Sequence, residues 1–284
     1  MRGGLARGDG VIAGVGPVLR HMLVNDDRDY VADDILAALR GMIAHVAWQV
    51  AGEDAPALAQ SLVDVPGLVA QAHALACEGH LTRRLRETQG FDAVLSPLMQ
   101  ALIASPQGEM AALAMQVLAA QARFVQQQRR MQWPLAELPA EVLHGALQAW
   151  RSLSGEGAAR EDLLRADYDE GATRLSLLAR LTARMGAASV AALDFSHAGV
   201  AMFATALAQA SGQGRGAALL SMLSRHSERL VLGLRAGGVS TSGVEAALLI
   251  LHPQASPPEG LGRITAERAA RLLAQADPLP GGVS

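Results

Sequence analysis

The sequence contains no lysine, a single cysteine and few aromatic residues. Its 24 basic side chains are therefore all arginine, and with 27 acidic side chains they give a formal net charge of −3. A net charge of this sign provides no general attraction to nucleic acids or to anionic membranes. Cys77 alone excludes an intramolecular disulfide and fits a reducing compartment. We therefore expect a cytoplasmic protein that does not bind nucleic acid.

Several local signatures of enzymes are also absent. The sequence has no Gly-x-Ser-x-Gly, no His-Glu-x-x-His and no phosphate loop, which needs a lysine. The N-terminal apolar stretch is a poor secretory signal, because Gly14, Gly16 and Pro17 interrupt it. No uncharged apolar run approaches the roughly 18 residues needed to span a bilayer. We expect no membrane association and no cofactor, and we favour a non-catalytic protein.

The most abundant residue types favour an all-α fold. Half of the residues are apolar, and alanine and leucine, which are good helix formers, supply most of them. Apolar residues within 29–51 step by three and four, the spacing of one helical face: Val31, Ile35, Leu36, Leu39, Met42, Ile43, Val46 and Val50. Shorter helices are predicted after Pro56 and Pro66, and further helices near 91–104 and from about 160 to 184; Ile264 and Thr265 provide a staple and a cap for a last helix.

Helices of this length joined by short turns predict irregular stacked helical hairpins, as in HEAT or armadillo arrays, but without a regular repeat period.

The segment SGEGAAR, residues 154–160, is the best candidate for a domain boundary. It separates an N-terminal helical half, 1–153, from a C-terminal half, 160–284, in which short helices alternate with turns rich in glycine and serine. A single continuous domain is the alternative, and both descriptions stay open at this point.

The sequence resembles an uncharacterised alphaproteobacterial family of helical proteins, a domain of unknown function, in three stretches: DDILAALRGMIAHVA, RFVQQQRRMQWPLAELPAEVLHGAL and LVLGLRAGGVSTSGVEAALLILHP. The resemblance covers most of the chain. It implies a repeat-like helical fold and a bacterial regulatory or scaffolding role. The family has no established catalytic residues, so the resemblance assigns no role to any position here.

One cluster has the spacing of metal ligands. His73, Cys77 and His80 are four and three residues apart, which places them on one helical face where imidazole and thiolate could bind zinc. One helix supplies at most three ligands here. The alternative is a buried thiol beside two histidines; we favour it, so we expect no metal.

Acidic residues crowd the start of the first long helix: Asp26, Asp27, Asp29, Asp33 and Asp34. Aspartate clusters hold Mg²⁺ in helical enzymes that ionise diphosphates, but here Tyr30 stands where the third aspartate of an Asp-Asp-x-x-Asp motif would be. We favour stabilisation of the positive end of the helix dipole.

The segment 228–251 is similar to a bacterial helix-turn-helix. Gly238 would provide the turn, Val239 and Val244 would pack inward, and Ser240 would cap the second helix. Arg225, Arg229 and Arg235 could contact the phosphates of DNA. Two features oppose DNA binding. Leu234 stands where a small residue is normally required, and the second helix offers few polar groups to read base edges.

Arginines and aromatic residues gather in RFVQQQRRMQW, residues 123–133. Arg123, Arg129, Arg130 and Trp133 form a candidate surface for an anionic ligand or a protein partner. The cluster Arg83-Arg84-Arg86 is a second place to look for an anion site. The opposing interpretation is an exposed helix end whose cations complement the dipole.

These observations favour a non-catalytic scaffold or regulatory module that binds another protein. Two alternatives stay open, namely a DNA-binding regulator that uses segment 228–251, and a small-ligand or metal-binding protein or enzyme. Association with further copies of the same chain is also compatible with the many Ala/Leu surfaces.

Overall fold

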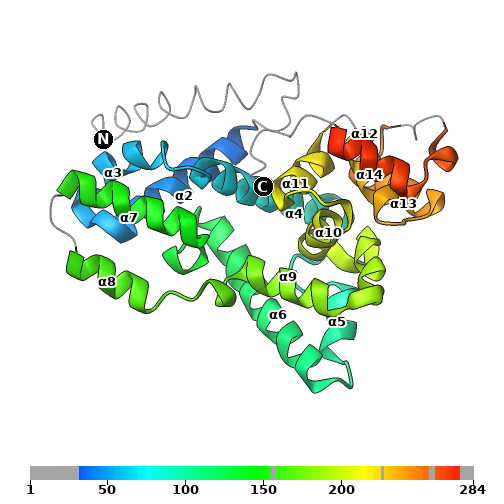
Figure 1. Ribbon diagram of the computed structural model, residues 1–284, viewed down its shortest axis with the longest axis horizontal. Helices are drawn as coiled ribbons and strands as arrows, with labels where there is room; N and C mark the ends of the chain where they lie inside the picture. The colour runs from blue at the N-terminus through cyan, green and yellow to red at the C-terminus, as the bar shows by residue number, and fades with distance from the viewer. Residues whose placement is uncertain (1–31, 155–157, 225–226, 256–259, 276–284) are drawn as a thin grey trace.

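The computed structural model describes residues 32–154, 158–224, 227–255 and 260–275, and within these ranges the chain is helical and contains no strand (Figure 1). The α-helices of the first part are α2 (Asp33–Ala51), α3 (Ala55–Leu62), α4 (Leu68–Gln89), α5 (Pro97–Ile103), α6 (Gly108–Arg129) and α7 (Ala140–Ser154). Those of the second part are α8 (Ala158–Ala166), α9 (Arg174–Arg184), α10 (Phe195–Ser211), α11 (Arg215–Leu223), α12 (Glu228–Ala236), α13 (Thr241–Leu251) and α14 (Ala266–Gln275). Short 3-10 turns join several of them: η2 (Gly52–Asp54), η3 (Leu135–Glu137), η4 (Glu170–Ala172), η5 (Gly186–Leu193) and η6 (Leu261–Arg263).

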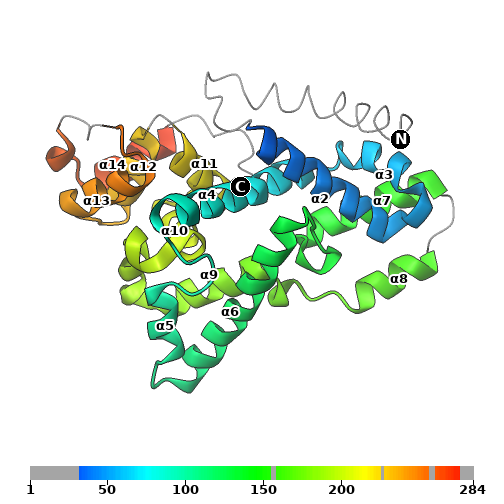
Figure 2. The same cartoon turned by 180° about the vertical axis from the view of Figure 1, so that it is seen from behind.

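The predicted all-α fold of stacked helices is confirmed, and α4 lies at its centre. This helix packs against α2 and α6 on one side of the molecule and against α10 and α11 on the other (Figures 1 and 2). Residues 72–78 of α4 are all buried, as expected for a helix surrounded by others rather than one that faces solvent. The HEAT- or armadillo-like type of the array stays a prediction.

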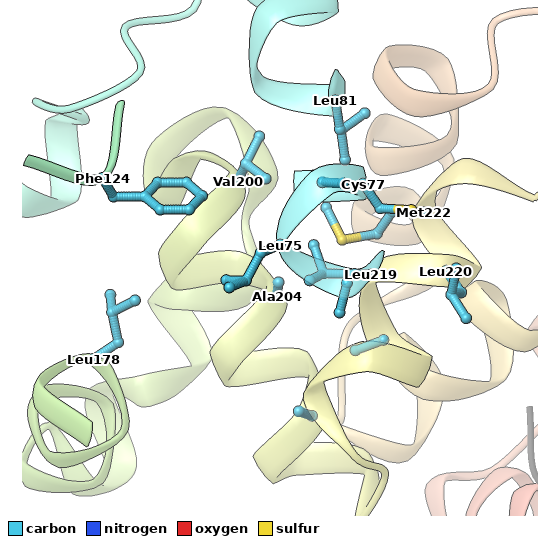
Figure 3. Packing of buried hydrophobic residues seen from close by; sticks show 14 of the residues in the cluster. Leu75, Cys77, Leu81, Phe124, Leu178, Val200, Ala204, Leu219, Leu220 and Met222 are labelled. Carbon is cyan, nitrogen blue, oxygen red and sulfur yellow. The ribbon is translucent and has the colours of Figure 1, made fainter. Parts of the chain in front are cut away.

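Around α4 the core is built mainly from small and branched aliphatic side chains. Figure 3 shows Cys77 and Leu81 of α4 with Leu219 and Met222 of α11, while Val200 and Ala204 of α10 lie near Leu75. These side chains belong to one buried apolar cluster that extends through both parts of the chain. Burial of this apolar surface is the main favourable contribution to folding.

The first long helix begins and ends for local reasons. Its predicted apolar face is confirmed, since Ile35, Leu39, Ile43 and Val46 are fully buried. Gly52 ends the helix with a φ of 59°, and its N–H donates to the carbonyl of Trp48.

The stretch 33–62, which runs from α2 through α3, is long and apolar enough to cross a membrane. The 3-10 turn η5 and α10 would together also be long and apolar enough, although they meet at a bend of 114°. The expectation of no membrane association stays a prediction.

Three predicted helices differ from those observed. The helix that follows Pro66 is not short but has 22 residues. The helix predicted near 91–104 starts only at Pro97, where the Ser96 hydroxyl accepts from the N–H of Met99. The predicted helix over 160–184 is divided into α8 and α9. There, Asp169 and Thr173 accept backbone N–H bonds locally, an arrangement that competes with a continuous helix.

The two predicted halves contact each other. α9 packs against α6, and both α10 and α11 pack against α4. The central residues of the predicted break, 155–157, lie outside the described residues, so the boundary there stays a prediction.

Gly41 marks a close approach between α2 and the segment that follows α6. A Cβ atom at Gly41 would lie 2.4 Å from the Cβ of Met131, a separation that real side chains do not adopt. Met131 has a φ of 53° and occupies the position after the helix end that glycine usually takes. The bonds from the Met131 N–H to the Gln128 carbonyl and from the Gln132 N–H to the Gln127 carbonyl complete this helix end.

Candidate functional site

Helices α2, α4 and α6 line a cavity of about 450 Å³ that is partly open to solvent. Its apolar wall consists of small or flat side chains: Ala38, Ala76, Ala93, Phe124 and Val125. Its polar lining comes mostly from α4 and from the end of α6: His80, Thr82, Arg83, Arg86, Glu87, Gln128 and Arg129. The volume lies within the range of small-molecule sites in proteins, and such sites combine an apolar wall with a few polar groups in the same way.

Gly79 allows α4 and α6 to approach beside this cavity. A Cβ at this position would lie 2.6 Å from the side-chain oxygen of Gln128. The amide of Gln128 in turn donates to the sulfur of Met42 on α2, at 3.6 Å. A glycine in the middle of α4 therefore places all three helices around one space, at the usual cost of a glycine within a helix.

The structure brings together arginines that are far apart in the sequence. Arg86 lies in the last turn of α4 and Arg129 in the last turn of α6. Both side chains are exposed and line the same cavity. Neither has a hydrogen bond or an ion pair with another described residue. Two guanidinium groups from different helices therefore line one space, and neither is held in an ion pair by another described residue, although the carboxylate of Glu87 lines the same cavity.

Arg83 is engaged differently, because it shares Asp34 with His80. The Nδ1 of His80 lies 2.7 Å from Oδ2 of Asp34 on α2, and Arg83 pairs with the same oxygen. Partial burial raises the pKa of Asp34, but the hydrogen bond and charge of His80 and the charge of Arg83 outweigh burial and lower it below its ordinary value. Asp34 is thus a fixed anion that orients two groups at the cavity.

Behind the cavity wall lies a buried charge network that the sequence analysis missed. The Phe124 ring lines the cavity, and the guanidinium carbon of Arg174 lies 3.6 Å from its centroid. Arg174 pairs with Glu78, which also pairs with Arg215, and Gln121 accepts a further bond from Arg174 at 3.0 Å. The signal that could have indicated this network is a glutamate within the apolar run HALACEGH of α4.

The candidate metal ligands do not converge. The Nε2 of His73 lies 3.6 Å from the sulfur of Cys77 inside the core, whereas His80 bonds to Asp34. In the part of the chain that the structure describes, no three histidine, cysteine or acidic side chains are grouped to hold a metal. Burial, with a smaller effect from the charge of Asp34, raises the pKa of Cys77 to about 12. A thiol with that pKa is a poor ligand at neutral pH.

The candidate surface on residues 123–133 requires a correction. Trp133 is 2% exposed, and its indole N–H donates to the Glu137 carbonyl at 3.3 Å. Its backbone carbonyl accepts from Gln49 of α2, so this segment is held against the core. Arg123 and Arg130 are exposed but do not line the cavity, and of the four predicted residues only Arg129 does.

The predicted turn at Gly238, the cap at Ser240 and the inward packing of Val239 and Val244 are confirmed. Gly238 has a φ of 80°, the hydroxyl of Ser240 accepts from the Gly243 N–H at the start of α13, and both Val239 and Val244 are buried. The outer face of α13 is unsuited to DNA, however, because it presents Glu245 and a Leu249 that is 72% exposed.

The arginines expected to contact phosphate have partners within the protein. Arg235 donates to the Ile264 carbonyl with two nitrogens, at 3.0 and 2.7 Å, and Arg229 donates to the side chain of Gln213 at 2.9 Å. Arg225 lies outside the described residues. These contacts disfavour DNA binding by segment 228–251.

The acidic cluster does not act as a unit in the described residues. Asp26, Asp27 and Asp29 lie outside them, Asp33 is exposed, and Asp34 pairs with His80 and Arg83.

Comparison with protein families, with curated proteins and with solved structures finds no match for this chain. The resemblance to a helical domain family therefore stays a prediction.

Proposed function

We propose that this protein is a non-catalytic helical binding module that holds a small anionic molecule in the cavity between α2, α4 and α6. One observation carries the proposal. Arg86 and Arg129, from two helices, line one cavity of about 450 Å³ and lack a carboxylate partner among the described residues. Guanidinium groups recognise carboxylates and phosphates through paired hydrogen bonds, and an apolar wall strengthens such bonds by excluding water.

The side chains at the cavity support binding rather than chemistry. Its polar lining offers mainly cations and hydrogen-bond donors, together with the carboxylate of Glu87. The one thiol of the sequence, Cys77, lies on the same helix but is fully buried, and burial raises its pKa to about 12. At neutral pH this group is protonated and inert, and so it provides no nucleophile for a bound ligand.

Calorimetric titration with small carboxylates and with inorganic phosphate tests this proposal. We expect at least one anion to bind, and we expect Arg86→Gln combined with Arg129→Gln to weaken binding by about 100-fold. Each lost charge-assisted bond is worth on the order of 1.5 kcal/mol or more. The matched control is Arg123→Gln combined with Arg130→Gln, which removes two exposed arginines of the same region that do not line the cavity. Equal losses in both double variants would contradict the proposal.

A second function, the binding of a protein partner, is favoured by a separate observation. Trp48 is 65% exposed on α2, and Arg40 and Ala44 continue an exposed stripe on that helix. Met131, 41% exposed, packs against Gly41 on the same helix. Exposed tryptophan, methionine and arginine are enriched at protein interfaces.

Affinity capture with wild-type protein and with Trp48→Ala tests the second function. We expect a stoichiometric partner that the Trp48→Ala variant fails to retain, while the cavity variant Arg86→Gln/Arg129→Gln retains it. Sedimentation of the purified protein separates a heterologous partner from a second copy of this chain. Capture that is insensitive to Trp48 would contradict the assignment of this surface.

A further inference from the structure

We infer that the cavity selects an amphipathic carboxylic acid, a molecule with one negative charge and an apolar body, rather than a multiply charged phosphate. This inference rests on the proposed function, because it names the class of anion that the same cavity binds.

The charges around the cavity leave one positive charge uncompensated. Arg83, Arg86 and Arg129 line it, as does Glu87. With histidine counted as neutral, Asp34, which also bonds to His80, balances Arg83, and Glu87 adds a negative charge to the space that Arg86 and Arg129 line. A single carboxylate balances what is left. A phosphate with two or more charges would enter a site with too few cations and lose more hydration than it regains.

Helix direction also opposes a polyanion. Arg86 and Arg129 both lie in the last turn of their helices, where the helix dipole presents its negative end. Phosphate sites in proteins typically use the opposite end, where free backbone N–H groups point at the anion. Here the anion meets only side-chain donors, and the unfavourable interaction with the negative helix ends is larger for a doubly charged anion than for a singly charged one.

The rest of the cavity favours an apolar body. Ala38, Ala76, Ala93, Phe124 and Val125 form its wall, and the burial of hydrocarbon against them contributes about 25 cal/mol for each Å². The volume of about 450 Å³ equals that of about 15 water molecules in the liquid. A ligand with roughly that many non-hydrogen atoms therefore fits.

Thr82 is a second, independent sign of a ligand. This residue lines the cavity and is 9% exposed, and its hydroxyl has no hydrogen-bond partner among the described residues. A buried hydroxyl without a partner costs on the order of 1–3 kcal/mol. Thr82 and Arg86 are four residues apart on α4 and so lie on one helical face, where the carboxylate of the ligand would accept a bond from this hydroxyl and offset that cost.

The experiment compares four probes by calorimetry, all below their aggregation concentration: decanoate, decanol, decyl phosphate and inorganic phosphate. We expect decanoate to bind about tenfold or more tightly than each of the others. Binding of decanoate should also weaken in Arg86→Gln/Arg129→Gln, which removes the charge.

A cavity-filling variant separates binding inside the cavity from binding on the surface. Ala38→Leu places a larger side chain at the cavity wall from α2, whereas Ala44→Leu on the same helix is exposed and does not line the cavity. We expect decanoate binding to be lost in Ala38→Leu and retained in Ala44→Leu. Thermal unfolding of each variant checks that the fold is kept, and retained binding in a folded Ala38→Leu protein would overturn the inference.

The outcomes separate the two proposals. Tighter binding of decyl phosphate or inorganic phosphate than of decanoate, if it depended on Arg86 and Arg129, would reject the inference that the ligand is a carboxylic acid. The proposed anion-binding function would be retained in that case. If decanol bound with the same affinity as decanoate, the ligand would not need a negative charge, and the inference would be rejected. If no anion bound in an arginine-dependent way, both proposals would be rejected.

Discussion

Glu78 of α4 and Arg174 of α9 lie 96 residues apart in the sequence and form a bidentate ion pair in the core, with two nitrogen–oxygen distances of 2.8 Å. Arg215 of α11 adds a second pair of bonds to the same carboxylate, each of 2.9 Å. Glu78 is inaccessible to solvent and Arg174 is 2% exposed. The network therefore connects α4 to two helices of the second part of the chain inside the apolar core.

Removal of the carboxylate at this position should destabilise the protein strongly. In Glu78→Gln, two guanidinium groups lose their counter-charge in a buried site, so we expect the free energy of unfolding to fall by about 3–5 kcal/mol. Chemical denaturation followed by circular dichroism measures the change. The control is Glu109→Gln, which breaks an exposed pair with Arg184 and should alter stability little. Similar losses in the two variants would contradict a structural role for the buried network.

The same carboxylate should make stability depend on pH. Burial alone would raise the pKa of Glu78, but the charges and hydrogen bonds of Arg174 and Arg215 outweigh it and hold the pKa well below the ordinary value of 4.5. The unfolded chain thus binds a proton at higher pH than the folded chain does. The contribution of Glu78 is complete above 4.5 and is lost as pH falls below it. We expect a shallower loss of stability in acid for Glu78→Gln than for wild type, measured from about pH 6 to about pH 3.

Cys77 should be unreactive in the folded protein. Its sulfur is buried among apolar side chains of α4 and α11 (Figure 3), and burial raises its pKa to about 12. A thiol reagent should label it only when the chain unfolds, because the thiolate is the reactive form. Since the sequence has one cysteine, the amount of label reports the unfolded fraction directly. Rapid stoichiometric labelling without denaturant would contradict this placement.

The contact between Gly41 and Met131 predicts a compensating pair of substitutions. Gly41→Ala introduces a Cβ into the 2.4 Å gap and should lower stability by about 1–3 kcal/mol, as overpacking does. Met131→Gly removes the opposing Cβ and relieves the positive φ of 53°. The double variant should therefore recover much of the loss in a double-mutant cycle of unfolding free energies. Additive effects of the two changes would mean that the two residues do not oppose each other.

Arg235 distinguishes a structural role from DNA recognition. Its guanidinium donates to the carbonyls of Ile264 and Val239, so it ties the start of α14 to the turn before α13. We expect Arg235→Gln to lower the free energy of unfolding by about 1.5–3 kcal/mol, the value of bonds to a charged donor. Exposed Arg263 is the matched control. A variant with unchanged stability, together with salt-dependent DNA binding that Arg235→Gln weakens, would restore the helix-turn-helix function.

Much of the secondary structure could be predicted because it depends on neighbours in the sequence. The three- and four-residue spacing of Leu39, Met42 and Val46 indicated the buried face of α2, and Trp48, which falls outside that stripe, is exposed. Ser240 and Thr265 cap the helices that follow them, as predicted, because a cap bonds to a backbone N–H three residues away.

The candidate site could be predicted only in part. Arg83, Arg86 and Arg129 were each recognised as candidates for anion binding, but nothing in their spacing indicated that they line one cavity. Trp133 was expected to form a surface with the neighbouring arginines, but it is buried, and its backbone carbonyl accepts a bond from Gln49 of α2.

The sequence by itself determined the helical composition, the helix caps at Ser240 and Thr265 and the lack of local catalytic motifs, because these features depend on contacts within a few residues. The tertiary structure alone decided which faces meet. It placed α4 at the centre, paired Glu78 with arginines 96 and 137 residues away, and brought Arg86 and Arg129 to one cavity. Periodicity identifies the buried face of a helix, but the partner of that face depends on how all the helices pack together.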